Sequence, residues 1–143
     1  MKYFLIVLVA IVLASCSPFG INTMGYASPH YDLDTAWRMA ASIEYKADTV
    51  NYCQSPRETA RLGTGDCEDI TAYMMYLLGE DTQLASGYTP WDSTLHAVLF
   101  YKDEYLEPQT VGYKFTSETI GPEKLYSYAY IMANFTYWGT KSL

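Results

Sequence analysis

Three side chains have the types and the order of a thiol nucleophile, a base and an acid. Cys67 follows Gly65-Asp66 at the expected start of a helix, where unpaired backbone amides and the helix dipole favour a thiolate. His96 opens an expected strand, and a Cys/His pair supplies a nucleophile and a general acid for the leaving group. Glu107 lies on the next expected strand, where a carboxylate would orient the imidazole. We therefore expect Cys67, His96 and Glu107 to form a catalytic group.

Each of these residues also has an ordinary structural explanation. Cys67 could be a buried helix cysteine, or it could form a disulfide with Cys53 in an oxidising compartment. His96 could be a strand histidine unrelated to Cys67, and Glu107 a carboxylate at a strand end. These alternatives stay open at the level of sequence.

The neighbours of Cys67 are acidic, which disfavours a thiolate and makes a cationic partner necessary. Asp66 is expected to be the helix cap rather than a catalytic acid. Gln54 is either a solvated loop residue or a donor to an oxyanion. The tyrosine-rich C-terminal segment is expected to pack as a strand, with a carbohydrate or peptide platform as the alternative.

The elements that must position these residues are helices first and strands afterwards. Apolar residues at i, i+3 and i+4 spacing predict two helices, and period-two alternation predicts strands. The expected helices cover about 32–46 and 67–78, with Asp66 as a cap and Gly79 as a stop, and a short turn is possible at 56–59. The expected strands cover 83–88, 96–101, 105–107 and 126–135, with a turn at 102–104. The fold class is α+β, with N-terminal helices packed on a small antiparallel sheet.

The expected hairpin raises a problem for Glu107. If Asp103 and Glu104 form a two-residue turn, Glu107 pairs with Phe100, on the same face as His96 but four residues along the strand. That offset is about 13 Å at the rise of a strand, so contact would need a bulge or a strong twist.

Several motifs resemble the transglutaminase-like superfamily of thiol enzymes. They are Ser55-Pro56-Arg57-Glu58-Thr59, Gly63-Thr64-Gly65-Asp66-Cys67-Glu68-Asp69, His96-Ala97-Val98-Leu99 and Tyr105-Leu106-Glu107-Pro108. The similarity spans about residues 32–135. It implies a papain-like thiol core, of a kind found in protein crosslinkers, proteases, peptide amidases and arylamine acetyltransferases.

The resemblance also implies roles for individual residues: Cys67 as nucleophile, His96 as base and Glu107 as the residue that orients His96. Three features depart from the family pattern. Its third residue is more often Asp, the interval between His96 and Glu107 is short, and Cys53 stands where the family has an aromatic residue. The expected function is a thiol enzyme acting on amide or peptide bonds through an acyl-enzyme. The alternative is an inactive surface lipoprotein that serves as a binding or assembly module.

The N-terminus has the pattern of an export signal. An apolar run at 3–13 follows Lys2, and it is too short to span a bilayer. The following Leu13-Ala14-Ser15-Cys16 resembles the bacterial lipoprotein box, which implies cleavage before Cys16 and attachment of acyl chains such as palmitate. We expect a signal peptide at 1–15, a lipidated tether at 16–31 and one domain at 32–143, anchored to a membrane of the bacterial cell envelope. A retained membrane helix with an incidental cysteine is the alternative.

Composition limits the partners. The chain has 143 residues and a net charge of −7, which argues against a nucleic-acid footprint. His30 lies in the expected tether without a second metal-type residue at a suitable spacing, so we expect no metal and no cofactor. A peptide or protein substrate is expected, while the substrate's identity and the oligomeric state stay open.

Overall fold

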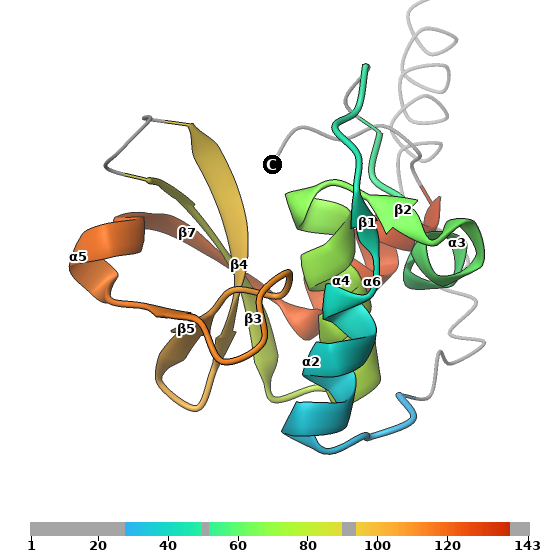
Figure 1. Ribbon diagram of the computed structural model, residues 1–143, viewed down its shortest axis with the longest axis horizontal. Coiled ribbons are helices and arrows are strands. Elements are labelled where there is room, and N and C mark those ends of the chain that lie inside the picture. Colours follow the sequence, from blue (N-terminus) through green and yellow to red (C-terminus); the bar gives the residue numbers. More distant parts are fainter. Residues whose placement is uncertain (1–27, 50–51, 90–93, 138–143) are drawn as a thin grey trace, which may run out of the picture.

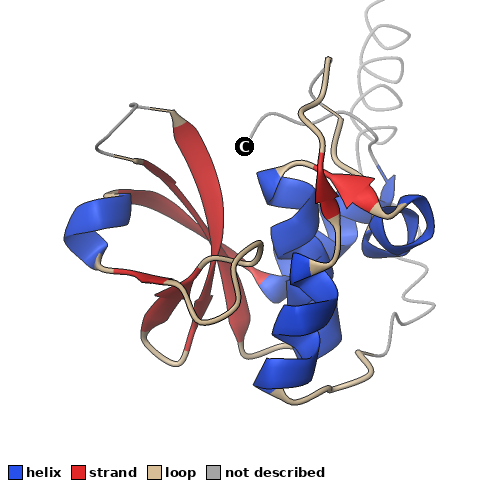
Figure 2. Ribbon diagram, viewed as in Figure 1, coloured by secondary structure: helices blue, strands red, loops and turns tan. Residues whose placement is uncertain are grey.

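The computed structural model describes residues 28–49, 52–89 and 94–137. Helices α2, α3, α4 and α6 gather on one side of the molecule, and the five-stranded antiparallel sheet forms the other side together with the short helix α5 (Figures 1 and 2). The helices are α2 (Leu33–Ala41), α3 (Pro56–Leu62), α4 (Cys67–Leu78), α5 (Ser117–Ile120) and α6 (Tyr128–Tyr137). The strands are β1 (Glu44–Tyr45), β2 (Thr64–Gly65), β3 (Thr82–Tyr88), β4 (Leu95–Tyr101), β5 (Glu104–Leu106), β6 (Lys114–Phe115) and β7 (Pro122–Ser127). The expected α+β class is confirmed.

Helix α4 is the centre of the helical side, and it begins at Cys67 as expected. The Asp66 side chain accepts hydrogen bonds from the backbone N–H groups of Glu68 and Asp69, and the Asp69 side chain accepts one from the Asp66 N–H. This capping box fixes the first turn of the helix. The helix packs against α2 and α3 on one side and against β3 and β4 on the other.

Helix α2 is shorter than expected. Asp32 caps its start by accepting from the Thr35 N–H, and Ser42 ends it. The expected continuation to residue 46 is wrong, because the chain after Ser42 becomes the parallel strand β1. Its N–H groups donate to the backbone oxygens of Gly63 and Gly65 instead of continuing the helix.

Helix α3 replaces the short turn that was expected at 56–59. Ser55 caps the helix through the Glu58 N–H, and Pro56 occupies the first turn, where a missing N–H costs nothing. Gly63, with φ of 68°, ends the helix in the left-handed conformation that favours glycine.

The sheet has the strand order β6-β5-β4-β3-β7, and every neighbouring pair is antiparallel. Alternation along β4 sends Ala97 and Leu99 into the core shared with the helices. Val98 belongs to a smaller cluster with Phe115 and Ile120. His96 has the same parity as Val98, so its side chain leaves the strand on the face of this smaller cluster.

The hairpin between β4 and β5 turns one residue earlier than expected. Tyr101 pairs with Glu104, so Lys102 and Asp103 form the turn, and both have positive φ (49° and 63°). Positive φ at both central residues marks a type I′ turn, which matches the twist of the strands.

The expected last strand at 126–135 is wrong. Strand β7 ends at Ser127, and α6 follows at once. Tyr128, Ile131 and Met132 contact the main core. Their spacing is that of a helix, whereas the alternating tyrosines imitate a strand. The expectations also missed β6 and α5.

Residues 28–31 lie against the end of α4. The Tyr31 N–H donates to the Leu77 carbonyl at 2.9 Å, and His30 lies close to Gly79. The expected signal peptide and Cys16 fall outside the described residues. Within the described part of the chain, no helix is long and apolar enough to cross a membrane.

Candidate active site

Cys67 occupies the first position of α4 and is partly buried. Neither Cys67 nor Cys53, which is 1% exposed, is part of a disulfide. The structure therefore does not contain the alternative Cys53–Cys67 disulfide. The Cys53 Sγ instead donates to Glu68 Oε1 at 3.3 Å.

His96 lies in β4 between two partners. Its Nε2 is 2.6 Å from Glu107 Oε2. Burial disfavours the charged imidazole, but hydrogen bonds and the negative charges of Cys67 and Glu107 outweigh it and raise the pKa of His96 to about 10. The ring also meets Phe115 edge-on, with 6.0 Å between the centroids. Cys67 at a helix start and His96 on a strand were expected, and their joint catalytic role stays a prediction.

The expected separation of Glu107 from His96 is wrong. Because the turn uses Lys102 and Asp103, extending the register places Glu107 opposite Val98 rather than Phe100. Glu107 then lies diagonally across from His96, at a spacing that long side chains bridge without a bulge. The short hairpin thus brings the acid and the base together.

Two further polar side chains are buried on the helical side of the site. The buried Thr71 hydroxyl lies 2.7 Å from the Cys67 carbonyl oxygen and 3.2 Å from that of Ala97, the residue after His96. Gln54 is buried rather than solvated: its side-chain oxygen accepts from Thr59. Its role as an oxyanion donor stays a prediction.

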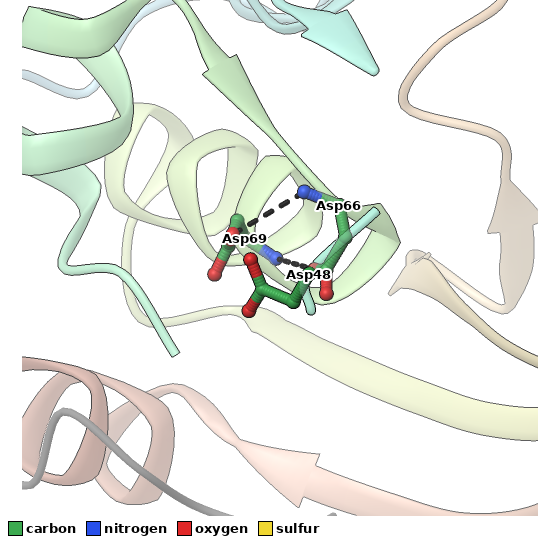
Figure 3. Close-up of side chains that lie close together, drawn as sticks. All are labelled: Asp48, Asp66 and Asp69. Carbon is green, nitrogen blue, oxygen red and sulfur yellow. Dashed lines mark hydrogen bonds between the residues drawn. The ribbon is translucent and has the colours of Figure 1, made fainter. Parts of the chain in front are cut away.

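Three aspartates converge beside Cys67, and the sequence analysis missed this cluster. One carboxylate oxygen each from Asp48, Asp66 and Asp69 lies within 4.8 Å of the others (Figure 3). Burial and the charge of Asp66 raise the pKa of Asp69 to about 8, and burial also raises that of Asp66. The Asp66/Asp69 pair at i, i+3 was a signal, but Asp48 joins it only through the fold.

Asp48 and Asp66 border an open pocket of about 340 Å³ that Cys67 also lines. Burial and the nearby Asp66 raise the pKa of Glu68, which also lines it, to about 7. Tyr45 and Leu95 form apolar parts of the wall and are 55% and 46% exposed. The remaining lining residues are Ala47 and Thr49.

Comparison with solved structures identifies the fold. The calcium-bound structure of Legionella pneumophila LapG matches with a TM-score of 0.53 and 19% sequence identity, over 66% of each chain. A second Legionella pneumophila LapG structure matches with a TM-score of 0.50 and 19% identity, over 66% of this chain and 60% of that one. The fold is transglutaminase-like. This agrees with the papain-like core that was expected from the sequence. The matched region is somewhat less than two thirds of LapG. No family model and no curated protein match the chain.

Proposed function

We propose that this chain is a lipid-anchored thiol enzyme that acts on amide or peptide bonds through an acyl-enzyme on Cys67. The observation that carries the proposal is the 2.6 Å contact between His96 Nε2 and Glu107 Oε2, on an imidazole whose pKa Cys67 also raises. A protonated imidazole beside the thiol stabilises the thiolate. The helix start at Cys67 adds a favourable dipole, and the open pocket provides access.

The roles of the residues follow from these positions. The Cys67 thiolate attacks the carbonyl carbon, so an S–C bond forms and the carbonyl oxygen takes up the negative charge. As the C–N bond breaks, protonated His96 gives its proton to the leaving amine. Neutral His96 then takes a proton from water or from a second amine, which attacks the acyl-enzyme and releases the thiolate. Glu107 holds Nε2, so Nδ1 is the ring nitrogen that exchanges the proton.

The aspartate cluster fits a calcium ion, and one LapG structure is calcium-bound. Calcium takes oxygen ligands at 2.3–2.6 Å, so two oxygens on one ion are separated by at most about 5 Å, as in this cluster. Burial and the charge of Asp66 raise the pKa of Asp69, and a cation in the cluster would offset both effects. We propose that Asp48, Asp66 and Asp69 supply part of a calcium site, completed by water. A bound cation would supply positive charge beside the first turn of α4.

The anchor is the part of the proposal that rests on sequence alone. The Leu13-Ala14-Ser15-Cys16 box supports lipid attachment at Cys16, in a membrane of the bacterial cell envelope. Cys16→Ser should abolish labelling by a clickable fatty acid and leave an unprocessed precursor. Labelling that persists in this variant would remove the anchor from the proposal.

The enzyme proposal is tested by trapping the acyl-enzyme. A library of acyl-donor peptides is incubated with the full chain, and the adduct is located by mass spectrometry. The wild-type protein and the Cys53→Ser variant, which keeps a donor for Glu68, should both carry the adduct on Cys67. Cys67→Ala should carry none. If no donor acylates Cys67, and iodoacetamide modifies it at neutral pH no faster than an ordinary thiol, the chain is a binding module instead.

A further inference from the structure

The carboxylate of Glu107 is held at both oxygens. Oε2 meets His96 Nε2 at 2.6 Å, and Oε1 accepts from the backbone N–H of Gln109 at 3.1 Å. The carboxylate thus has little freedom to rotate away from His96 as long as the backbone of Glu107 stays in place.

The backbone of Glu107 is held by two local hydrogen bonds and a distant one. Its N–H donates to the Tyr113 carbonyl at 3.0 Å, and its carbonyl accepts from the Thr110 N–H at 3.2 Å. The same carbonyl accepts from the Trp37 indole Nε1 at 2.7 Å, from a residue 70 positions away. The shortest of the three backbone bonds is therefore the one that connects the acid to another part of the molecule.

Trp37 belongs to the helical side of the protein. It lies in α2, is 5% exposed, and packs in the main core. Helix α2 packs against α4, which begins at Cys67. In Figure 1 the orange loop after β5 reaches toward α2, where the Trp37 bond is made. This bond links the loop that carries the acid to the helices that carry the nucleophile.

We propose that Trp37 is a positioning residue, whose indole N–H holds Glu107 at the distance that keeps its carboxylate against His96. The proposal rests on the proposed function for its effect on turnover. Its structural part, the dependence of the His96–Glu107 contact on Trp37, stands independently of turnover. The groups that face His96 are Cys67 from α4 and Glu107 after β5.

The indole N–H has an effect that packing alone does not explain. If it is removed, the Glu107 carbonyl keeps the Thr110 N–H, so no buried acceptor is left without a partner. What is lost is the connection to α2, so the loop can relax away from the helices. Small displacements of a catalytic group are costly to rate even when the fold survives.

Two variants separate the N–H from the ring. Trp37→Phe keeps an aromatic side chain, and 3-benzothienylalanine at position 37 keeps the bicyclic shape while replacing the N–H by sulfur. The His96 ring signals are followed by NMR against pH in the full chain, which is simple because the chain has two histidines. Both variants should shift the His96 midpoint down by about one pH unit or more, toward the ordinary value of 6.5. They should lower kcat for Cys67-dependent turnover about tenfold or more, with KM within about twofold.

Ala40→Gly is the matched control, because it weakens the same helix at a buried position without removing the Trp37 bond. It should lower the melting temperature and leave the His96 midpoint unchanged. An unchanged midpoint in the benzothienylalanine variant, or an equal shift in Ala40→Gly, overturns the proposal. If the wild type shows no Cys67-dependent turnover, the proposed function fails, while the NMR comparison still decides the role of Trp37.

Discussion

The sheet side and the helix side of the candidate site balance their charges in different ways. On the sheet, His96 and Glu107 form an ion pair with 2.6 Å between their atoms. At the start of α4, four carboxyl groups gather, and within the described residues no Lys or Arg forms an ion pair with them. These carboxyl groups belong to Asp48, Asp66, Glu68 and Asp69.

The two sides therefore obtain their counter-charges from different sources. The base and the acid of the sheet side compensate each other, so burial strengthens their attraction. On the helix side, burial without a counter-charge raises the pKa of Glu68 and Asp69 to about 7 and about 8. A cation from solution would therefore stabilise the start of α4 most and would stabilise the sheet side little. The three predictions that follow test each half and the connection between them.

The largest expected effect is on the sheet side. Glu107→Gln removes the negative charge that orients and stabilises protonated His96, so acylation of Cys67 should slow by about two to four orders of magnitude, by analogy with loss of a triad acid. The measurement is the rate of acyl-enzyme formation by mass spectrometry. Glu104→Gln is the matched control, because Glu104 lies on the same hairpin but pairs with Lys114 at the surface. Near-normal acylation in Glu107→Gln would reduce the site to a Cys67–His96 dyad.

The second prediction concerns calcium and pH on the helix side. Asp69 has a pKa of about 8 in the fold and an ordinary value of 3.8, so without metal its contribution to stability is full below about pH 4 and is lost as the pH rises through 8. Calcium binds the ionised form, so the gain in melting temperature on adding calcium should grow from pH 6 to pH 8.5. At a free calcium concentration 100 times Kd, binding should add about 2.7 kcal/mol to the free energy of unfolding.

The control for calcium uses an aspartate that follows the other end of α4. Asp48→Asn should weaken the calcium effect, because it removes a carboxylate from the cluster, whereas Asp81→Asn, at an exposed position outside the cluster, should leave it intact. Magnesium should give a smaller gain than calcium, since it demands stricter octahedral geometry. If adding calcium changes the melting temperature at no pH, the cluster is not a calcium site.

The smallest expected effect is on the connection between the two sides. Thr71→Val removes the hydroxyl that lies between the Cys67 and Ala97 carbonyl oxygens, which should cost about 1 kcal/mol of folding free energy and slow acylation several-fold. Thr82→Val is the comparison, because its buried hydroxyl donates to the Gly79 carbonyl away from Cys67. Thermal unfolding and acylation rates are measured for both. Equal effects of the two variants on acylation would mean that Thr71 has no special connection to the site.

The sequence was most informative where local chemistry decides the structure. Asp66 followed by an apolar stripe predicts α4 and its first residue, because a cap and a helical period act within a few positions. The strand that carries His96 follows in the same way from its apolar run. The placement of Cys67 and His96 was therefore accessible before the structure.

The missed features depend on conformations that local preference does not favour. Lys102 adopts a positive φ, which is uncommon for a lysine, so the turn was expected one residue later and Glu107 was expected too far along the strand. The alternating tyrosines around Ser127 favour a strand, but the contact of Ile131 with the core is made by a helix. Asp48 reaches Asp66 and Asp69 only through tertiary structure.

The tight turn at Lys102-Asp103 also has a consequence for the order in which the site assembles. His96 and Glu107 are 11 positions apart, so closing one hairpin brings them together, an event that takes about 1–10 μs in isolated hairpins. The Trp37 bond spans 70 positions and requires the helices to dock on the sheet first. During folding, the base and the acid can therefore pair early, while the thiol meets them only when the two layers close. The nascent chain would thus complete the proposed catalytic group only at the last stage of folding.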